Sequence, residues 1–193
     1  MKTAFVRPLT FFAAVCLAGF AAVSPARSTE RPTFALLPLV AGDTGMPYQV
    51  HATQAERAEL GAKFERGVIA MKGGIAVPSA RVEHAIAAAG YDQNSAYKQC
   101  DDAVCARKVG RSLHVETVMF GSVTRALAMI WGSEVSLVDV ASGNVTGPYD
   151  LGYKGDFLTL STGVDVLAQA VSTRMIADAA VRKRSHAVAS NRR

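Results

Sequence analysis

Two cysteines and the residues between them form the stretch of this sequence that is best suited to chemistry. Cys100 and Cys105 stand five positions apart, and Asp101 and Asp102 lie between them. Thiols and carboxylates in such a cluster could bind a metal ion, take part in redox exchange or close a disulfide. The spacing of the two cysteines helps to decide among these three possibilities.

The cysteine spacing favours a structural disulfide. A zinc site needs more ligands, and His84 or His114 would have to supply them without any characteristic spacing. Thiol oxidoreductases use Cys-x-x-Cys, whereas four residues separate the cysteines here. A thiol near a helix N-terminus still has a lowered pKa, so a redox role remains the first alternative and a metal site the second.

A helix that begins directly after Cys100 would bring the two cysteines together. Asp101 would then be the N-cap and Asp102 the first helical residue, where carboxylates meet free N–H groups and the positive end of the helix dipole. Cys100 and Cys105 would occupy N′ and N4, the two positions that touch in a hydrophobic staple. The sequence therefore predicts a helix from about Asp101 to Leu113 with a disulfide, Cys100–Cys105, across its first turn.

The N-terminal segment predicts export. Lys2 and Arg7 precede an apolar run over residues 9–23, which has the length of a signal-peptide core and is short for a membrane span. Small residues allow cleavage at Ala26 or at Ser28. We therefore expect a signal peptide over residues 1–26 and a periplasmic protein, with an uncleaved anchor as the alternative.

The third cysteine is expected to leave with the signal peptide. Cys16 follows Val15, whereas a lipobox has a small residue, usually Gly or Ala, directly before its cysteine. The mature chain would then keep two cysteines, which in an exported protein most simply form a disulfide. No other stretch of the sequence is long and apolar enough to cross a membrane.

The positive charge is concentrated at the two ends of the chain. The formal charge is +5, and seven lysines and arginines lie in the signal segment and in the last stretch, residues 181–193. Subtracting these seven charges from +5 leaves a body of −2, so the domain itself is not basic and we expect no nucleic-acid partner. The last stretch is interpreted as a basic flexible tail, with contact to anionic lipid or nucleic acid as the alternative.

Hydrophobic periodicity and turn residues divide the rest of the 193-residue chain into strands and helices. Thr53 and Glu56 match a capping box at the start of an amphipathic helix, and Gly73 follows its last apolar residue. Ser79 can cap the next helix. The expected strands are residues 33–40, 75–77, 116–123, 133–140 and 148–155, with a hairpin turn at 141–144; the expected helices are residues 53–72, 79–90, 101–113 and 160–180.

This element order predicts one α/β domain over residues 31–180. The order is β-α-β-α-α-β-β-β-α, which gives a mixed sheet with helices packed on it and a C-terminal antiparallel meander. The last strand of the meander, with two tyrosines and a glycine, is suited to a sheet edge. Gly110 costs about 1 kcal/mol within a helix, which suggests a close approach of that helix to the sheet.

From Cys100 onward the chain has a cysteine pair, a Gly-x-Val pattern that begins at Gly121 and an Asp-Val-x-x-Gly pattern that begins at Asp139. In these patterns it resembles a family of secreted proteobacterial proteins built on a domain of unknown function. More distantly, residues 33–175 resemble the periplasmic fold of curli-secretion lipoproteins, penicillin-binding-protein activator lipoproteins and the N-terminal domain of the Tol translocation protein. The resemblance implies an accessory or protein-interaction module of the envelope. It is carried by a set of paired positions: Cys100 and Cys105, Gly110 and Leu113, Gly121 and Val123, Asp139 and Gly143, and Gly155 and Asp156.

The sequence contains no recognisable catalytic set. Nucleophile motifs, paired-carboxylate sites and phosphate loops are all missing from it. His51, His84 and His114 are interpreted as surface or hydrogen-bonded histidines. Asp156 could contact a ligand, but a turn or a helix cap explains it as well. We therefore predict a non-enzyme without catalytic residues, metal or cofactor.

Two hypotheses of function follow. The first is a non-catalytic accessory protein that binds another envelope protein through a sheet edge or a loop. The second is a small-ligand binder or an enzyme without recognised motifs, which would use the loop over residues 42–53 together with Asp156. Asp156 and His51 are the candidate contact residues for a ligand or partner.

Overall fold

Six strands and four helices make up the part of the chain that the computed structural model describes, residues 31–43, 45, 50–95, 97–127 and 129–190. The helices are α1 (Gln54–Ala70), α2 (Ser79–Ala88), α3 (Ala103–Leu113) and α4 (Phe157–Ser190). The strands are β1 (Thr33–Leu36), β2 (Val40–Ala41), β3 (Ile75–Ala76), β4 (Thr117–Ala126), β5 (Ile130–Asp139) and β6 (Val145–Lys154). The predicted signal peptide lies outside the described residues and stays a prediction.

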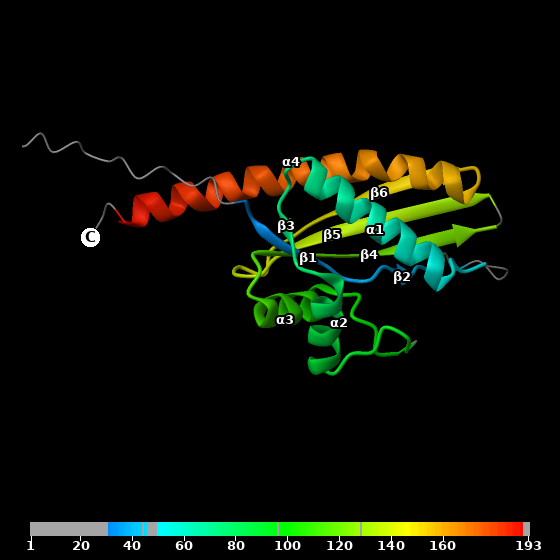
Figure 1. The fold of residues 1–193 in the computed structure, drawn as a ribbon, viewed down its shortest axis with the longest axis horizontal. Coiled ribbons are helices and arrows are strands. Elements are labelled where there is room, and N and C mark those ends of the chain that lie inside the picture. Colours follow the sequence, from blue (N-terminus) through cyan, green and yellow to red (C-terminus); the bar gives the residue numbers. More distant parts are fainter. Residues whose placement is uncertain (1–30, 44, 46–49, 96, 128, 191–193) are drawn as a thin grey trace, which may run out of the picture.

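The strands form one mixed sheet between two layers of helices, which confirms the predicted fold class. Its order is β3-β1-β4-β5-β6, and β2 pairs with β4 beyond the end of β1. Strands β1, β2 and β3 are parallel to their neighbours, whereas β4, β5 and β6 form the predicted antiparallel meander with β6 at the edge. Helices α1 and α4 cover one face of the sheet, and α2 and α3 cover the other (Figure 1).

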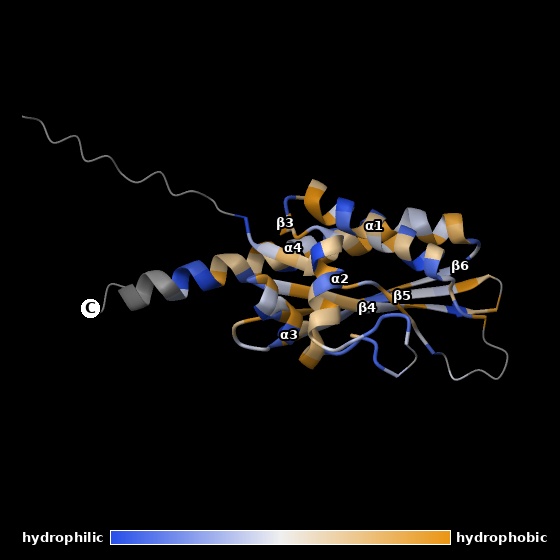
Figure 2. Cartoon of the chain, turned by 60° about the horizontal axis from the view of Figure 1, so that its bottom comes forward, coloured by the Kyte–Doolittle hydropathy of each residue, from blue (hydrophilic) through white to orange (hydrophobic). Residues whose placement is uncertain are grey.

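Each face of the sheet has its own hydrophobic core, because alternate strand residues point to opposite faces. Phe64 of α1, Trp131 of β5 and Leu160 of α4 belong to one core, and Val109 of α3 and Val138 of β5 belong to the other. Hydrophilic and hydrophobic residues alternate along α1, as an amphipathic helix on a sheet requires (Figure 2). The capping box of α1 is present as predicted.

The predicted first strand, residues 33–40, is divided in two. Leu36 pairs with Met119 and Val40 pairs with Ser122, so four steps along this strand match three steps along β4. The additional residue lies around Pro38, which has no N–H group for a ladder bond. The strand is therefore bulged, and among the described residues its outer edge pairs with no strand beyond the two residues of β3.

Two predicted helix starts are wrong by one residue. The N-cap of α3 is Asp102, whose side chain accepts a hydrogen bond from the Cys105 N–H at 2.7 Å, so Asp101 precedes the cap. The two cysteines consequently occupy N″ and N3 rather than N′ and N4. Helix α2 follows Pro78 without a side-chain cap, and Ser79 is already helical.

The last helix extends ten residues beyond its predicted end at residue 180. Helix α4 continues to Ser190, so residues 181–190 are helical and the interpretation of residues 181–193 as a flexible tail is wrong for this part. Arg182 accounts for the difference, because its guanidinium pairs with Asp139 at 2.6 Å and with Glu116 at 3.1 Å at the end of the sheet. None of the described helices is both long and apolar enough to span a bilayer.

Candidate functional site

A groove of about 530 Å³ lies between α1 and α2, where the short strand β3 ends. The bulged segment over residues 36–40 contributes to its lining, together with one face of each helix and the connector that follows α2, residues 91–94. The volume is within the range of about 300–1,000 Å³ that is typical of ligand sites. The groove is therefore a candidate binding site among the described residues.

The edge of the sheet supplies backbone groups to this groove. The carbonyls of Pro32 and Phe34 accept hydrogen bonds from Ile75 and Val77, both at 2.8 Å, whereas the Leu37 N–H points the other way and bonds to Met119. The backbone N–H and C=O groups of successive strand residues point to opposite edges, so those of Leu36 face the same edge as those of Pro32 and Phe34. An extended segment in the groove could therefore lie beside residues 36–40, where a longer β3 would lie.

Small residues on the helices keep the groove open. Ala58, Gly61 and Ala62 line it from α1, and Ala87 lines it from α2. A Cβ atom at Gly61 would lie 3.9 Å from the Leu39 side chain, an ordinary contact distance. The wall that α1 contributes therefore carries only short side chains at these positions, and larger side chains there would fill the groove.

Three carboxylates and one guanidinium line the groove. The carboxylates belong to Glu65, Glu83 and Asp92. Burial raises the pKa of Glu65, although the nearby charge of Arg66 acts in the opposite direction. Arg57 donates to the backbone carbonyls of Leu39 and Ala52, so its guanidinium already has partners.

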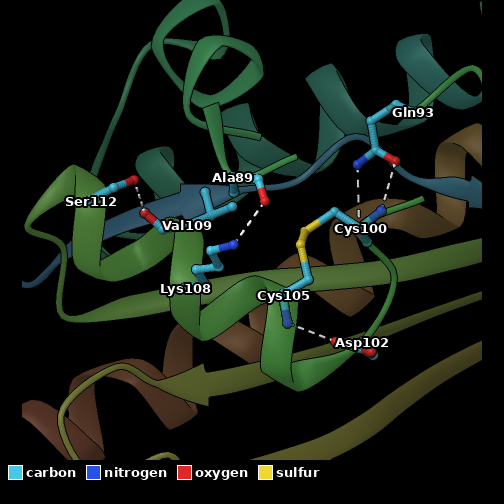
Figure 3. The surroundings of a disulfide bond; sticks show 8 residues. All are labelled: Ala89, Gln93, Cys100, Asp102, Cys105, Lys108, Val109 and Ser112. Carbon is cyan, nitrogen blue, oxygen red and sulfur yellow. Dashed lines mark hydrogen bonds between the residues drawn. A yellow bond between two sulfur atoms is a disulfide. The ribbon is translucent and has the colours of Figure 1, made fainter. Parts of the chain in front are cut away.

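The predicted disulfide is confirmed, and it stabilises the turn beside the groove. Cys100 and Cys105 are bonded, with their Cα atoms 5.4 Å apart, and both are buried. The Cys100 N–H donates to Gln93 Oε1 at 3.2 Å, and Gln93 Nε2 donates to the Cys100 carbonyl at 3.5 Å (Figure 3). Gln93 also lines the groove, so the disulfide-bonded turn holds one of its walls.

Helix α3 fixes the same wall at a second point. Lys108 donates to the Ala89 carbonyl at 2.8 Å and lies over the ring of Tyr91, 5.8 Å from its centre. Tyr91 lines the groove. The cysteine-containing stretch that seemed most suited to chemistry therefore has a structural role next to the binding-site candidate.

The two predicted contact residues lie elsewhere. Asp156 caps α4, since its carboxylate accepts hydrogen bonds from the Thr159 side chain at 2.6 Å and backbone at 2.8 Å, and these bonds lower its pKa. His51 is exposed two residues before the cap Thr53. Neither is among the described residues that line the groove, so their contact role stays a prediction.

His84 and His114, which the sequence analysis also considered, are exposed as well. His84 lies on α2, and His114 ends α3 in a left-handed conformation with φ of 56°. Within the described ranges, no group of three or more His, Cys, Asp or Glu side chains is arranged to hold a metal ion. The loop over residues 42–53 is described only in part.

Sequence reasoning missed the groove residues Arg57, Glu65 and Glu83. Two signals in the sequence could have indicated the groove. A proline at position 38 interrupts an otherwise apolar strand, and the small residues at positions 58, 61 and 62 recur at helical spacing. Neither signal shows by itself that α1 and α2 lie opposite each other across a sheet edge.

Comparison with known proteins gives weak structural likenesses. No family model matches the chain, and no curated protein matches it significantly. The fold is similar to the LpoB C-terminal domain from Salmonella enterica, with 10% identity, a TM-score of 0.49 and coverage of 67% of this chain and 87% of that one. For lipoprotein GNA1162 from Neisseria meningitidis the values are 12%, 0.48, 73% and 96%. For the PelC dodecamer from Paraburkholderia phytofirmans they are 15%, 0.42, 74% and 89%.

These three likenesses carry no argument about activity, partner or compartment, because their identities are 15% or lower and their TM-scores are under 0.5. The secreted family predicted from the sequence stays a prediction.

Proposed function

We propose that this chain is a non-catalytic accessory protein of the periplasm that binds another envelope protein, and that the groove between α1 and α2 receives a segment of that partner. The observation that carries the proposal is the bulged edge over residues 36–40, a strand edge recessed between two helices. Strand addition at such an edge is a common mode of peptide recognition. The signal-like N-terminus and the disulfide support the compartment.

The opposite edge of the sheet is less suited to a partner. Among the described strands, β6 pairs with β5 alone, but it carries Pro148 and the exposed charges of Asp150 and Lys154. Proline and charged side chains on an edge strand discourage pairing with a further strand. Residues 36–40 also contain a proline, Pro38, but no charged side chain. The recessed edge is therefore the better docking position.

The length of the free edge limits the size of the bound segment. At about 3.3 Å per residue, a segment that lies along residues 36–40 would have a length of roughly four or five residues. The helices on both sides would contact alternate side chains of that segment. A short extended stretch of a larger protein fits this geometry.

Site-specific photo-crosslinking in cells tests the proposal. A crosslinking amino acid at Ala62 or Ala87 would sit in the groove, whereas the same group at the exposed Ala70 of α1 would not. We expect protein adducts from the two groove positions, identified by mass spectrometry, and none from Ala70. Equal adducts from all three positions, or no protein adduct from the groove, would contradict the proposal.

A small-ligand binder is the second candidate function, and the volume of the groove favours it. The sequence assigned such a site to the loop over residues 42–53 and to Asp156, whereas the described pocket lies between α1 and α2. Native mass spectrometry of the full chain separates the two candidates. A bound small molecule that an Ala62→Trp variant no longer carries would favour this second function.

A further inference from the structure

We infer that the groove selects a partner segment bearing a lysine or arginine side chain, which pairs with the carboxylates of Glu65 and Glu83. This inference rests on the proposed function, since it assigns the chemistry of the segment that the groove receives.

The carboxylates of Glu65 and Glu83 have no partner in the described part of the chain. No hydrogen bond or ion pair there reaches either side chain, although Arg66 lies near enough to Glu65 to lower its pKa. Glu65 is half-buried, and burial of a carboxylate without a compensating charge is unfavourable. A cationic group in the groove would remove this cost.

The one positive charge that lines the groove offsets this negative charge only in part. Arg57 faces the groove from α1 and keeps its charge, while its Nε and Nη1 atoms donate to the carbonyls of Leu39 and Ala52. Asp92 adds a third carboxylate from the connector, where it accepts a hydrogen bond from the Asn94 N–H at 2.9 Å. Tyr91 and Gln93 are neutral neighbours. The field of the groove therefore attracts cations and repels anionic ligands.

The positions of the two glutamates match an extended segment. Glu65 projects from α1 and Glu83 from α2, on the two sides of the sheet edge. Side chains of an extended segment alternate between these two sides. The floor is apolar, with Leu36, Leu39 and Ile86 among its residues. The favoured segment therefore alternates apolar and basic side chains, or places one basic residue between apolar ones.

Selection from a displayed library of random hexapeptides tests this inference on the full-length protein. We expect peptides that bind the wild-type protein, but not a groove-filling Ala62→Trp variant, to be enriched in lysine and arginine. Ala70→Trp is the matched control, and it should select the same peptides as the wild type. Groove-dependent peptides that are neutral or acidic would overturn the inference while leaving the proposed protein-binding function intact.

The second arm measures the charge contribution directly. Fluorescence anisotropy of one selected peptide should show about tenfold weaker binding to a Glu65→Gln/Glu83→Gln variant and a steeper loss in high salt for the wild type. Glu59→Gln, on the exposed side of α1, should leave the affinity unchanged. Equal binding by the double variant, or by the same peptide with glutamine at its basic positions, would overturn the inference. If no peptide depends on the groove and Ala62 gives no protein adduct, the proposed function fails as well.

Discussion

The Nε atom of Arg57 donates a hydrogen bond to the carbonyl oxygen of Leu39 at 3.0 Å and thereby joins α1 to the free edge of the sheet. The same guanidinium donates to the carbonyl of Ala52, just before the helix. Leu39 follows the proline bulge, where no strand of the described part of the chain pairs on this side. Arg57 therefore supplies, at one point, the hydrogen bond that a neighbouring strand would make.

Replacing Arg57 with methionine should destabilise the protein by about 1–2 kcal/mol, because two carbonyls lose a charged donor. Urea denaturation measures the loss. Arg66→Met, an exposed arginine on the same helix, should change the free energy of unfolding by less than about 0.5 kcal/mol. Equal effects of the two variants would show that the contacts of Arg57 do not contribute to stability.

Two glycines in helices should respond in opposite directions to alanine. A Cβ atom at Gly110 of α3 would lie 2.5 Å from Val140 and 2.6 Å from Val118, so Gly110→Ala should cost about 1–3 kcal/mol through overpacking. Gly61 has room for a methyl group, and Gly61→Ala should stabilise the protein by about 0.5–1 kcal/mol through helix propensity. Thermal denaturation compares them, and a loss at position 61 would contradict the geometry of the groove wall.

Breaking the Cys100–Cys105 disulfide should lower the free energy of unfolding by about 2 kcal/mol, because the closed loop is short. Urea unfolding with and without reductant measures this difference. The Cys100→Ala/Cys105→Ala variant is the control, since reductant should not affect it. Since both side chains are no more than 1% exposed, thiol labels should react only after unfolding and reduction; labelling of unreduced, unfolded protein at these positions would restore the redox hypothesis.

The contact between Asp139 and Arg182 should give the protein an acid-sensitive anchor for α4. Burial acts to raise the pKa of Asp139, but hydrogen bonds from Ser142 and Arg182, with the charge of Arg182, outweigh it and lower the pKa below 3.8. Between the lowered pKa and 3.8, the unfolded chain binds more protons than the folded protein. The stabilisation is therefore present above pH 3.8 and is lost as the pH falls through the folded pKa.

An Asp139→Asn variant should therefore lose about 1 kcal/mol at neutral pH and lose less additional stability than the wild type as the pH falls below 3.8. Urea midpoints measured across this range give the comparison. Asp178→Asn removes the exposed pair with Arg174 and is the matched control, with little expected effect. If the urea midpoint of Asp139→Asn fell with pH as steeply as that of the wild type below pH 3.8, the proposed acid-sensitive contact would be wrong.

Glu65 should be unfavourable for stability at neutral pH. Burial raises its pKa above 4.5, so the folded protein binds more protons than the unfolded chain just above that value, and stability falls as the pH rises through this window. Glu65→Gln should then raise the free energy of unfolding at pH 7 by about 0.5 kcal/mol, which is measured as a higher urea midpoint. Glu59→Gln should leave the midpoint unchanged. Destabilisation by Glu65→Gln would mean that the carboxylate has a structural partner.

Much of the fold followed from local patterns. The capping box at Thr53 and Glu56, the hairpin turn over residues 141–144 and the alternating strands of the meander all depend on neighbouring residues, and the structure agrees with each. The end of α4 could not be predicted in this way. Arg182 finds Asp139 and Glu116 only after the sheet has formed, and no local signal records these partners.

The sequence by itself determined the α/β class, the antiparallel meander and the disulfide at the start of α3, because each depends on periodicity or on residues a few positions apart. Only the tertiary structure decided where the groove forms. Glu65 and Glu83 are 18 positions apart on different helices, and they face one groove because β3 ends after two residues and leaves the bulged edge uncovered. Such a site depends on the packing of distant segments, which no single stretch of sequence specifies.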